Sequence, residues 1–126
     1  MPRICIQVGD EEFHGELTPD SAPQTVQKIL DALPLEATAR TWGEEIYFNI
    51  PVEMGTENGQ ETVSKGDLAY WPSGNAFCIF YGKTPMSQND TEIVPASAVN
   101  VFGHIENAEA LKQHSAGEEV RVTLAE

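Results

Sequence analysis

The chain has 126 residues, and its 20 acidic against 7 basic side chains give a formal net charge of −13. This length predicts a single domain spanning residues 1–126, large enough to fold without disulfides or a structural metal. The negative charge repels phosphate backbones and anionic lipid, which argues against nucleic-acid and membrane partners, and we interpret it as a source of solubility. The longest apolar run, AFCIFY at 76–81, is too short to cross a membrane.

The N-terminal part predicts two strands and a helix. Arg3–Val8 is rich in β-branched residues, and Glu11–Leu17 follows it across a Gly-Asp hairpin turn. Apolar residues then recur at the spacing of one helical face, which predicts a helix over Ser21–Leu33. Ser21 and Gln24 have the spacing of a capping box, so we expect the first turn to cap itself.

The rest of the chain alternates strands with two long connections. Ala37–Trp42 and Glu45–Ile50 predict a hairpin. Pro51–Thr62 predicts an exposed loop, in which we expect three acids to be solvated, namely Glu53, Glu57 and Glu61. Gly82–Ser97 predicts a second irregular connection. The remaining expected elements are strands at Lys65–Trp71, Ala76–Tyr81, Val99–Ile105 and Glu119–Leu124, and a short helix capped by Asn107 at Ala108–His114.

Eight short strands and two helices predict a mainly β protein, a closed or nearly closed barrel with the helices covering its openings. An α+β sandwich is the structural alternative. Two segments, GDLAYWPSGNAFCIFYGKTP at 66–85 and VNVFGHI at 99–105, resemble the central strands of the cyclophilin family. The matching positions are Gly66, Leu68, Gly74, Phe77, Ile79, Lys83, Thr84, Val101, Phe102 and Gly103. The resemblance extends in order over nearly the whole chain and implies a cyclophilin-like eight-stranded barrel. A divergent branch of small prokaryotic cyclophilin-like proteins of unknown function is most similar.

The resemblance also implies prolyl isomerisation, but the residues that carry this activity in the family are missing. The position of the family's arginine falls on Phe48, or on Asn49 if the register shifts by one, and neither side chain is charged. Arg40 lies earlier in the chain, and nothing in the spacing requires it to reach the groove. The family's groove glutamine, tryptophan and histidine are replaced by Ala76, Met86 and Val99. We therefore predict no catalytic residue and no measurable isomerase activity.

Trp71 stands where the family has a small residue. An indole there either fills the proline pocket from within or forms an aromatic platform for another ligand, and simple packing in the core or at a rim is the alternative. We predict a remodelled groove that binds a small molecule or a peptide segment without catalysis. An isomerase of reduced or altered activity, and an enzyme of unrelated chemistry on the same barrel, are the alternatives. The predicted lining of the groove is Tyr47, Asn49, Met54, Trp71, Asn75, Phe77 and Met86.

The sequence predicts neither a metal site nor a cofactor. Its three histidines are far apart, and His14 shares one strand face with Glu16, which we expect to be solvated. Cys5 and Cys78 lie in apolar runs and are expected to be reduced and unpaired. Because the N-terminus enters a strand without the pattern of a secretory leader, we expect a reducing, cytoplasmic setting. The pattern predicts no particular oligomeric state.

Overall fold

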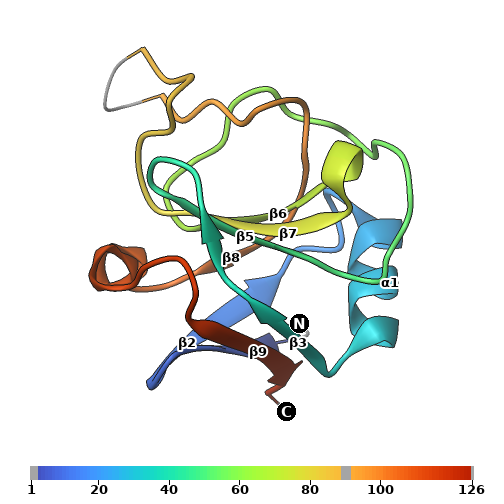
Figure 1. Ribbon diagram of the computed structural model, residues 1–126. Coiled ribbons are helices and arrows are strands. Elements are labelled where there is room, and N and C mark those ends of the chain that lie inside the picture. The colour runs from blue at the N-terminus through green and yellow to red at the C-terminus, as the bar shows by residue number, and fades with distance from the viewer. Residues whose placement is uncertain (1–2, 89–91, 126) are drawn as a thin grey trace.

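A single antiparallel sheet runs round the molecule in the strand order β3-β9-β1-β2-β8-β6-β7-β5-β4 (Figure 1). The computed structural model describes residues 3–88 and 92–125. The strands are β1 Arg3–Val8, β2 Glu11–Leu17, β3 Leu35–Thr38, β4 Arg40–Thr41, β5 Glu45–Asn49, β6 Asp67–Trp71, β7 Ala76–Phe80, β8 Asn100–Ile105 and β9 Glu119–Leu124. The helices are α1 Pro23–Ala32 and two 3-10 helices, η1 Pro72–Gly74 and η2 Ala108–Gln113.

One bent segment of chain brings the two ends of the sheet together. β3 and β4 stand at opposite ends of the strand order, yet only Ala39 separates them in sequence. β3 pairs with β9, and β4 pairs with β5. The sheet therefore returns on itself as a nearly closed barrel, and with β3 and β4 taken as one bent strand its nine elements are the eight strands predicted. The mainly β barrel with two flanking helices is confirmed.

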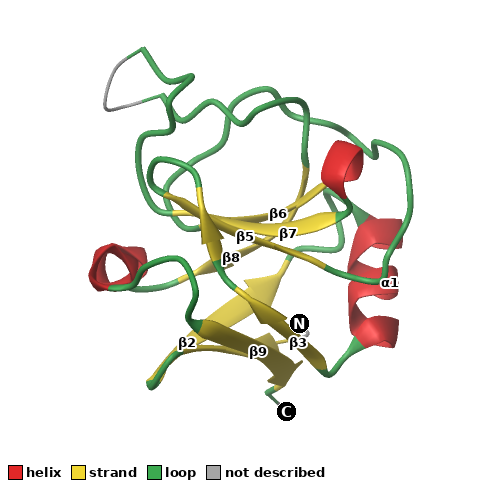
Figure 2. Ribbon diagram, viewed as in Figure 1, coloured by secondary structure: helices red, strands yellow, loops and turns green. Residues whose placement is uncertain are grey.

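Two helices flank the barrel, on opposite sides in the view of Figure 2. α1 turns three of its residues into the core, namely Thr25, Val26 and Ile29. η2 buries Ala108 and Leu111. The second predicted helix is thus a 3-10 helix, and its predicted cap is wrong, because Asn107 has a left-handed backbone (φ 62°) and makes no side-chain capping hydrogen bond.

The cap of α1 comes from a distant part of the chain, so the predicted capping box is also wrong. The Glu57 carboxylate accepts hydrogen bonds from the backbone N–H groups of Gln24 (3.0 Å) and Thr25 (2.8 Å) and from the Thr25 hydroxyl (2.8 Å). A carboxylate is favourable there because the first N–H groups of a helix lack partners within the helix. Burial acts to raise the pKa of Glu57, but these hydrogen bonds outweigh it and lower the pKa. Glu57 is therefore not the solvated loop acid that we expected.

Side chains on the strands alternate between the inside and the outside of the barrel. The inward side chains form the main core, in which the Phe48 and Phe77 rings stack with centroids 4.9 Å apart and Phe77 meets Phe102 edge-on at 5.2 Å. Outward side chains of β6 and β7 join residues of the connections in a second buried cluster of Val63, Ala69, Ala76, Cys78, Phe80, Ile93 and Val99.

The second cluster is buried because the two long connections fold over the outside of the sheet. They reach over the strands in the upper part of Figure 2, and there Val63 bridges to Ile93 while Gln60 bridges to Val99. The stretch predicted as an exposed loop thus includes buried residues, among them Val52. The outer face of β5, β6 and β7 is in consequence a partly covered surface rather than one open to water.

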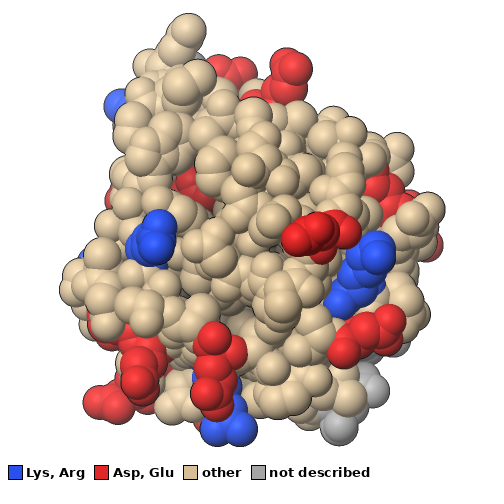
Figure 3. All heavy atoms as spheres, turned by 45° about the vertical axis from the view of Figure 1, so that its right-hand side comes forward, with Lys and Arg blue, Asp and Glu red and all other residues tan. Residues whose placement is uncertain are grey.

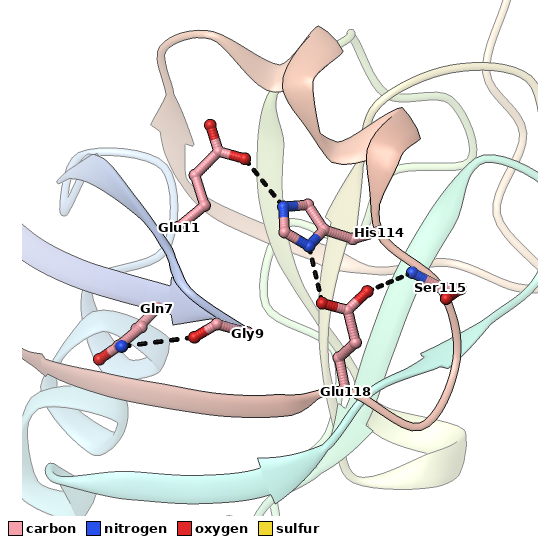
Figure 4. A network of polar contacts seen from close by, with 6 residues as sticks. All are labelled: Gln7, Gly9, Glu11, His114, Ser115 and Glu118. Atoms are coloured by element: carbon pink, nitrogen blue, oxygen red, sulfur yellow. Dashed lines mark hydrogen bonds and ion pairs between the residues drawn. The ribbon is translucent and has the colours of Figure 1, made fainter.

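His114 ties the end of η2 to β2 and to the turn before β9 (Figure 4). Its Nδ1 lies 2.9 Å from Glu118 Oε1, and its Nε2 lies 2.8 Å from Glu11 Oε1. Burial acts to lower the pKa of His114, but the hydrogen bonds to these two carboxylates outweigh it and raise the pKa. The histidine therefore links two acids, and these contacts favour its protonated form.

Candidate functional site

A pocket of about 220 Å³ lies on the outer face of the sheet, between β5, β6 and the second connection. We call it the outer pocket. Its lining is mostly apolar, three of its side chains are aromatic, and one is an acid. Both tryptophans of the chain contribute to it. The lining residues are Trp42, Glu45, Tyr47, Trp71, Pro95, Ala96 and Val99.

The pairing register explains why space is left at this point. β7 lies between β5 and β6, and two of its outward residues, Ala76 and Cys78, are small, while the third is Phe80. Tyr47 on β5 pairs with Cys78, and Trp71 on β6 pairs with Ala76. Paired residues of antiparallel strands project to the same face, so the two rings stand on either side of a low floor. Sheet register alone thus builds the two walls of the pocket.

The other walls come from the hairpin before β5 and from the second connection. The backbone N–H of Trp42 donates to the Glu45 backbone carbonyl oxygen at 3.0 Å, which holds residue 42 beside β5, and Trp42 lines the pocket there. The Trp71 Nε1–H donates to Ser97 Oγ at 2.6 Å and ties the indole to the segment that includes Pro95. The Thr84 hydroxyl donates to the Val94 carbonyl oxygen just before that segment. The connection is therefore anchored next to the pocket.

Glu45 is the acid in the lining, and only 6% of its surface is exposed. It occupies an outward position of β5, two residues before Tyr47, so both side chains point to the same face. Burial raises the pKa of Glu45 to about 7, and a hydrogen bond from the Cys78 thiol acts in the opposite direction. Burial, and then the negative charge of Glu45, hold the pKa of Cys78 well above its ordinary value. Near neutral pH the acid therefore exchanges a proton while the thiol stays neutral.

The structure brings two of the seven predicted lining residues, Tyr47 and Trp71, into the outer pocket. Trp71 is half-buried, and its ring neither points away from the pocket nor disappears into the core. It lies against Gly74, where an added Cβ would stand 2.5 Å from the indole Cζ3. This placement agrees both with an aromatic platform and with packing at a rim, and ligand contact by Trp71 stays a prediction.

The other five predicted residues lie elsewhere. Phe77 is fully buried inside the barrel, and Met54 packs against the main core. Asn49 Nδ2 donates to the Gly74 carbonyl oxygen at 2.7 Å, while Asn75 Oδ1 accepts from the Tyr70 hydroxyl at 3.0 Å. Met86 is 53% exposed on the second connection. Ligand binding by these five residues stays a prediction, although Phe77 faces the barrel interior and Met54 packs against the core with its sulfur 3.5 Å from the Thr25 hydroxyl.

The two candidate positions for the family's arginine differ in the direction of their side chains. Phe48 points into the barrel and is 1% exposed, so Asn49 is the candidate position that faces outward. Arg40 is exposed on β4 and pairs with Tyr47, which places both on the same side of the sheet. It is not among the residues that line the outer pocket.

The structure shows the state of the two cysteines and the grouping of possible metal ligands in the part of the chain that is described. Cys5 is half-buried and Cys78 buried, and both thiols are free. No group of three or more His, Cys, Asp or Glu side chains in residues 3–88 and 92–125 has the arrangement of a metal site. Within the same residues, no helix is both long and apolar enough for a membrane span.

Sequence reasoning missed Glu45 and Trp42. The signal for Glu45 was present, because alternation along β5 puts it on the same face as Tyr47 and Asn49. From the sequence, that face is expected to be exposed to solvent, because no local pattern indicates that the second connection folds over it. Trp42 lies in the predicted hairpin, but only the turn geometry brings it next to Glu45.

Comparison with known proteins agrees with the architecture. Residues 2–123 match the family model described as cyclophilin-like. A hypothetical protein from Archaeoglobus fulgidus, whose solution structure is known, aligns with a TM-score of 0.84 and 46% sequence identity over 98% of this chain and 95% of that chain. No curated protein matches the sequence. The resemblance that the central strands indicated is confirmed.

Proposed function

We propose that this chain, which belongs to the cyclophilin-like family, binds a small molecule or a peptide segment in its outer pocket and does not isomerise prolyl bonds. The pocket itself carries the proposal. It is a hollow of about 220 Å³ with aromatic walls and one buried acid. Concave, mostly apolar sites with a few polar groups are the usual form of small-molecule sites. We further propose a reducing, cytoplasmic setting, which the two free cysteines support.

A fragment screen read by NMR tests the binding role. The indole N–H signals of Trp42 and Trp71 report on the outer pocket directly, because these are the only two tryptophans of the chain. We expect fragments that bind to shift both signals, and Trp71→Ala to weaken their binding. The matched control is Tyr81→Phe, since Tyr81 is buried outside the lining. Binding that leaves both indole signals unmoved would place the ligand elsewhere and contradict the proposal.

The isomerase alternative has one observation in its favour, the position of Arg40 opposite Tyr47. A guanidinium can make charge-assisted hydrogen bonds that neither Phe48 nor Asn49 can make. The side chain of Arg40 is exposed, however, and does not line the pocket. An enzyme that stabilises a transition state needs the charged group held in place, and this geometry does not hold it.

We therefore expect no measurable acceleration of proline isomerisation. The assay is a proline-limited refolding reaction at micromolar protein, with an ordinary cyclophilin as the positive control. Arg40→Ala should leave the baseline unchanged. Acceleration within about a hundredfold of the positive control, which corresponds to retaining all but about 3 kcal/mol of its effect on the barrier, would support the isomerase instead.

A further inference from the structure

Glu45 is unusual among the charged side chains of this protein. Of the acids and bases that the structure describes, it is the only one that is buried. None of the ion pairs formed among residues 3–88 and 92–125 includes it, while its neighbour Glu44 pairs with Lys112 at 3.7 Å. A buried carboxylate without a cation is costly, because its charge loses water and gains little in return. Within the described part of the chain, this acid therefore has no cation to pair with its ionised form.

The walls around Glu45 are those that favour a cation. Trp42, Tyr47 and Trp71 line the same pocket as the acid, and aromatic faces attract organic cations through their negative ring surfaces. The Trp71 indole is held by its hydrogen bond to Ser97, and β7 contributes the small side chains of Ala76 and Cys78 beside Trp71 and Tyr47. An acid at the base of aromatic walls is the arrangement that recognises alkylammonium groups.

We propose that the ligand of the outer pocket presents a small alkylammonium group, which sits between Trp42, Tyr47 and Trp71 with its positive charge against Glu45. This inference rests on the binding role proposed above and names the chemistry of the ligand. A volume of about 220 Å³ lies below the range of roughly 300–1,000 Å³ that drug-sized ligands occupy, so one head group fills it.

The charge of the whole protein favours the same ligand class. The chain carries a net charge of −13, and acidic side chains lie scattered over the face seen in Figure 3 rather than in one patch. A field of this sign attracts cations and repels anions over a distance of about one Debye length, 8–10 Å in physiological salt. An anionic ligand would be repelled both by this field and by the ionised Glu45. A neutral ligand would bring no positive charge to the ionised acid.

Binding of a cation should be linked to the proton on Glu45. Since the pKa of Glu45 is about 7 in the empty pocket, the ionised fraction rises about tenfold between pH 6 and pH 8. The other titratable or charged groups around it are Cys78 on β7, Tyr81 after β7, Arg40 on β4 and Glu44 beside it. Burial raises the pKa of both Cys78 and Tyr81, so they remain neutral in this range.

Choline and its neutral isostere 3,3-dimethylbutan-1-ol test the proposal on the wild-type protein. Choline keeps its charge at every pH, so any pH dependence belongs to the protein. Tryptophan fluorescence is the readout, because both tryptophans line the pocket. We expect choline to bind more tightly than the isostere at pH 8, and its affinity to rise about tenfold from pH 6 to pH 8. The affinity of the isostere should not rise with pH.

Two variants complete the design. Glu45→Gln keeps the shape of the side chain and should abolish both the preference for choline and its pH dependence. Glu44→Gln makes the same change in net charge at a residue outside the lining and should preserve both. A short peptide with trimethyllysine, compared with choline, shows whether a protein side chain or a free molecule is the better source of the head group.

Each outcome has a definite meaning. Tighter binding of choline than of the isostere, rising with pH and lost in Glu45→Gln, supports the proposal. Equal binding of both probes overturns the cation while leaving the pocket as a binding site. Tighter binding of the isostere, or failure of choline to bind wild-type protein at pH 8, overturns the cation as well. In that case the fragment screen decides separately whether the pocket binds anything.

Discussion

Replacing Asn100 with alanine is expected to lower the free energy of unfolding by about 3–5 kcal/mol, because it breaks a fully buried junction of three segments. Asn100 Nδ2 donates to Thr25 Oγ1 at 3.2 Å and to the Gly55 carbonyl oxygen at 3.1 Å. Its Oδ1 accepts from the Glu57 N–H at 2.8 Å. The side chain thereby joins β8 to α1 and to the first connection.

The expected loss of stability arises from the polar groups that lose a hydrogen-bond partner when the Asn100 side chain is removed. The Gly55 carbonyl oxygen and the Glu57 N–H would lose their Asn100 partner, while the Thr25 hydroxyl keeps its bond to Glu57. Each polar group that loses its partner costs about 1–3 kcal/mol. Urea denaturation measures the change, and Asn49→Ala is the control, since this exposed asparagine makes one side-chain hydrogen bond, to Gly74. The control should lose at most about 1 kcal/mol. A loss that small for Asn100→Ala would show that the junction is not a major source of stability.

This junction also shows which parts of the fold local pattern can predict. Strands such as Arg3–Val8 and the helix around Val26 follow from periodicity, which is a property of neighbouring residues. The bonds of Asn100 link residues 43 to 75 positions apart, so no local pattern contains them. The same holds for Glu57, which caps a helix 32 and 33 residues away. An acid in a polar stretch looks solvated until the tertiary fold gives it a partner.

The residues of the candidate site also divide into those that the sequence predicted and those that only the tertiary fold reveals. Tyr47 and Trp71 were found because the family resemblance drew attention to them, and the structure places both in the outer pocket. Phe77 came from the same resemblance, but alternation along β7 turns it into the barrel. Glu45 could be identified only with knowledge of the connection that covers the outer face of β5. Burial of the outer face depends on the path of two connections that have little regular structure, and periodicity says nothing of such segments.

Replacing Glu45 with glutamine is expected to raise the free energy of unfolding at pH 8 by up to about 3 kcal/mol, with little change at pH 5. The pKa of Glu45 is raised from an ordinary value of 4.5 to about 7 in the folded protein. Between these values the folded form holds a proton that the unfolded form has lost. The contribution of this group is therefore fully present below about pH 4.5 and is lost as the pH rises through 7.

Chemical denaturation at intervals from pH 5 to pH 8 measures this contribution directly. The wild-type protein should lose stability as the pH rises, and Glu45→Gln should lose less, since its amide has no proton to give up. The slope left above about pH 6.5 belongs to His114, whose pKa is also raised and whose contribution disappears in the same direction. Glu44→Gln controls for net charge and should keep the wild-type slope. If the unfolding free energies of wild type and Glu45→Gln changed with pH in parallel, Glu45 would ionise in the pocket without cost. Glu45 would then need no cationic partner, and this argument for a cationic ligand would fail.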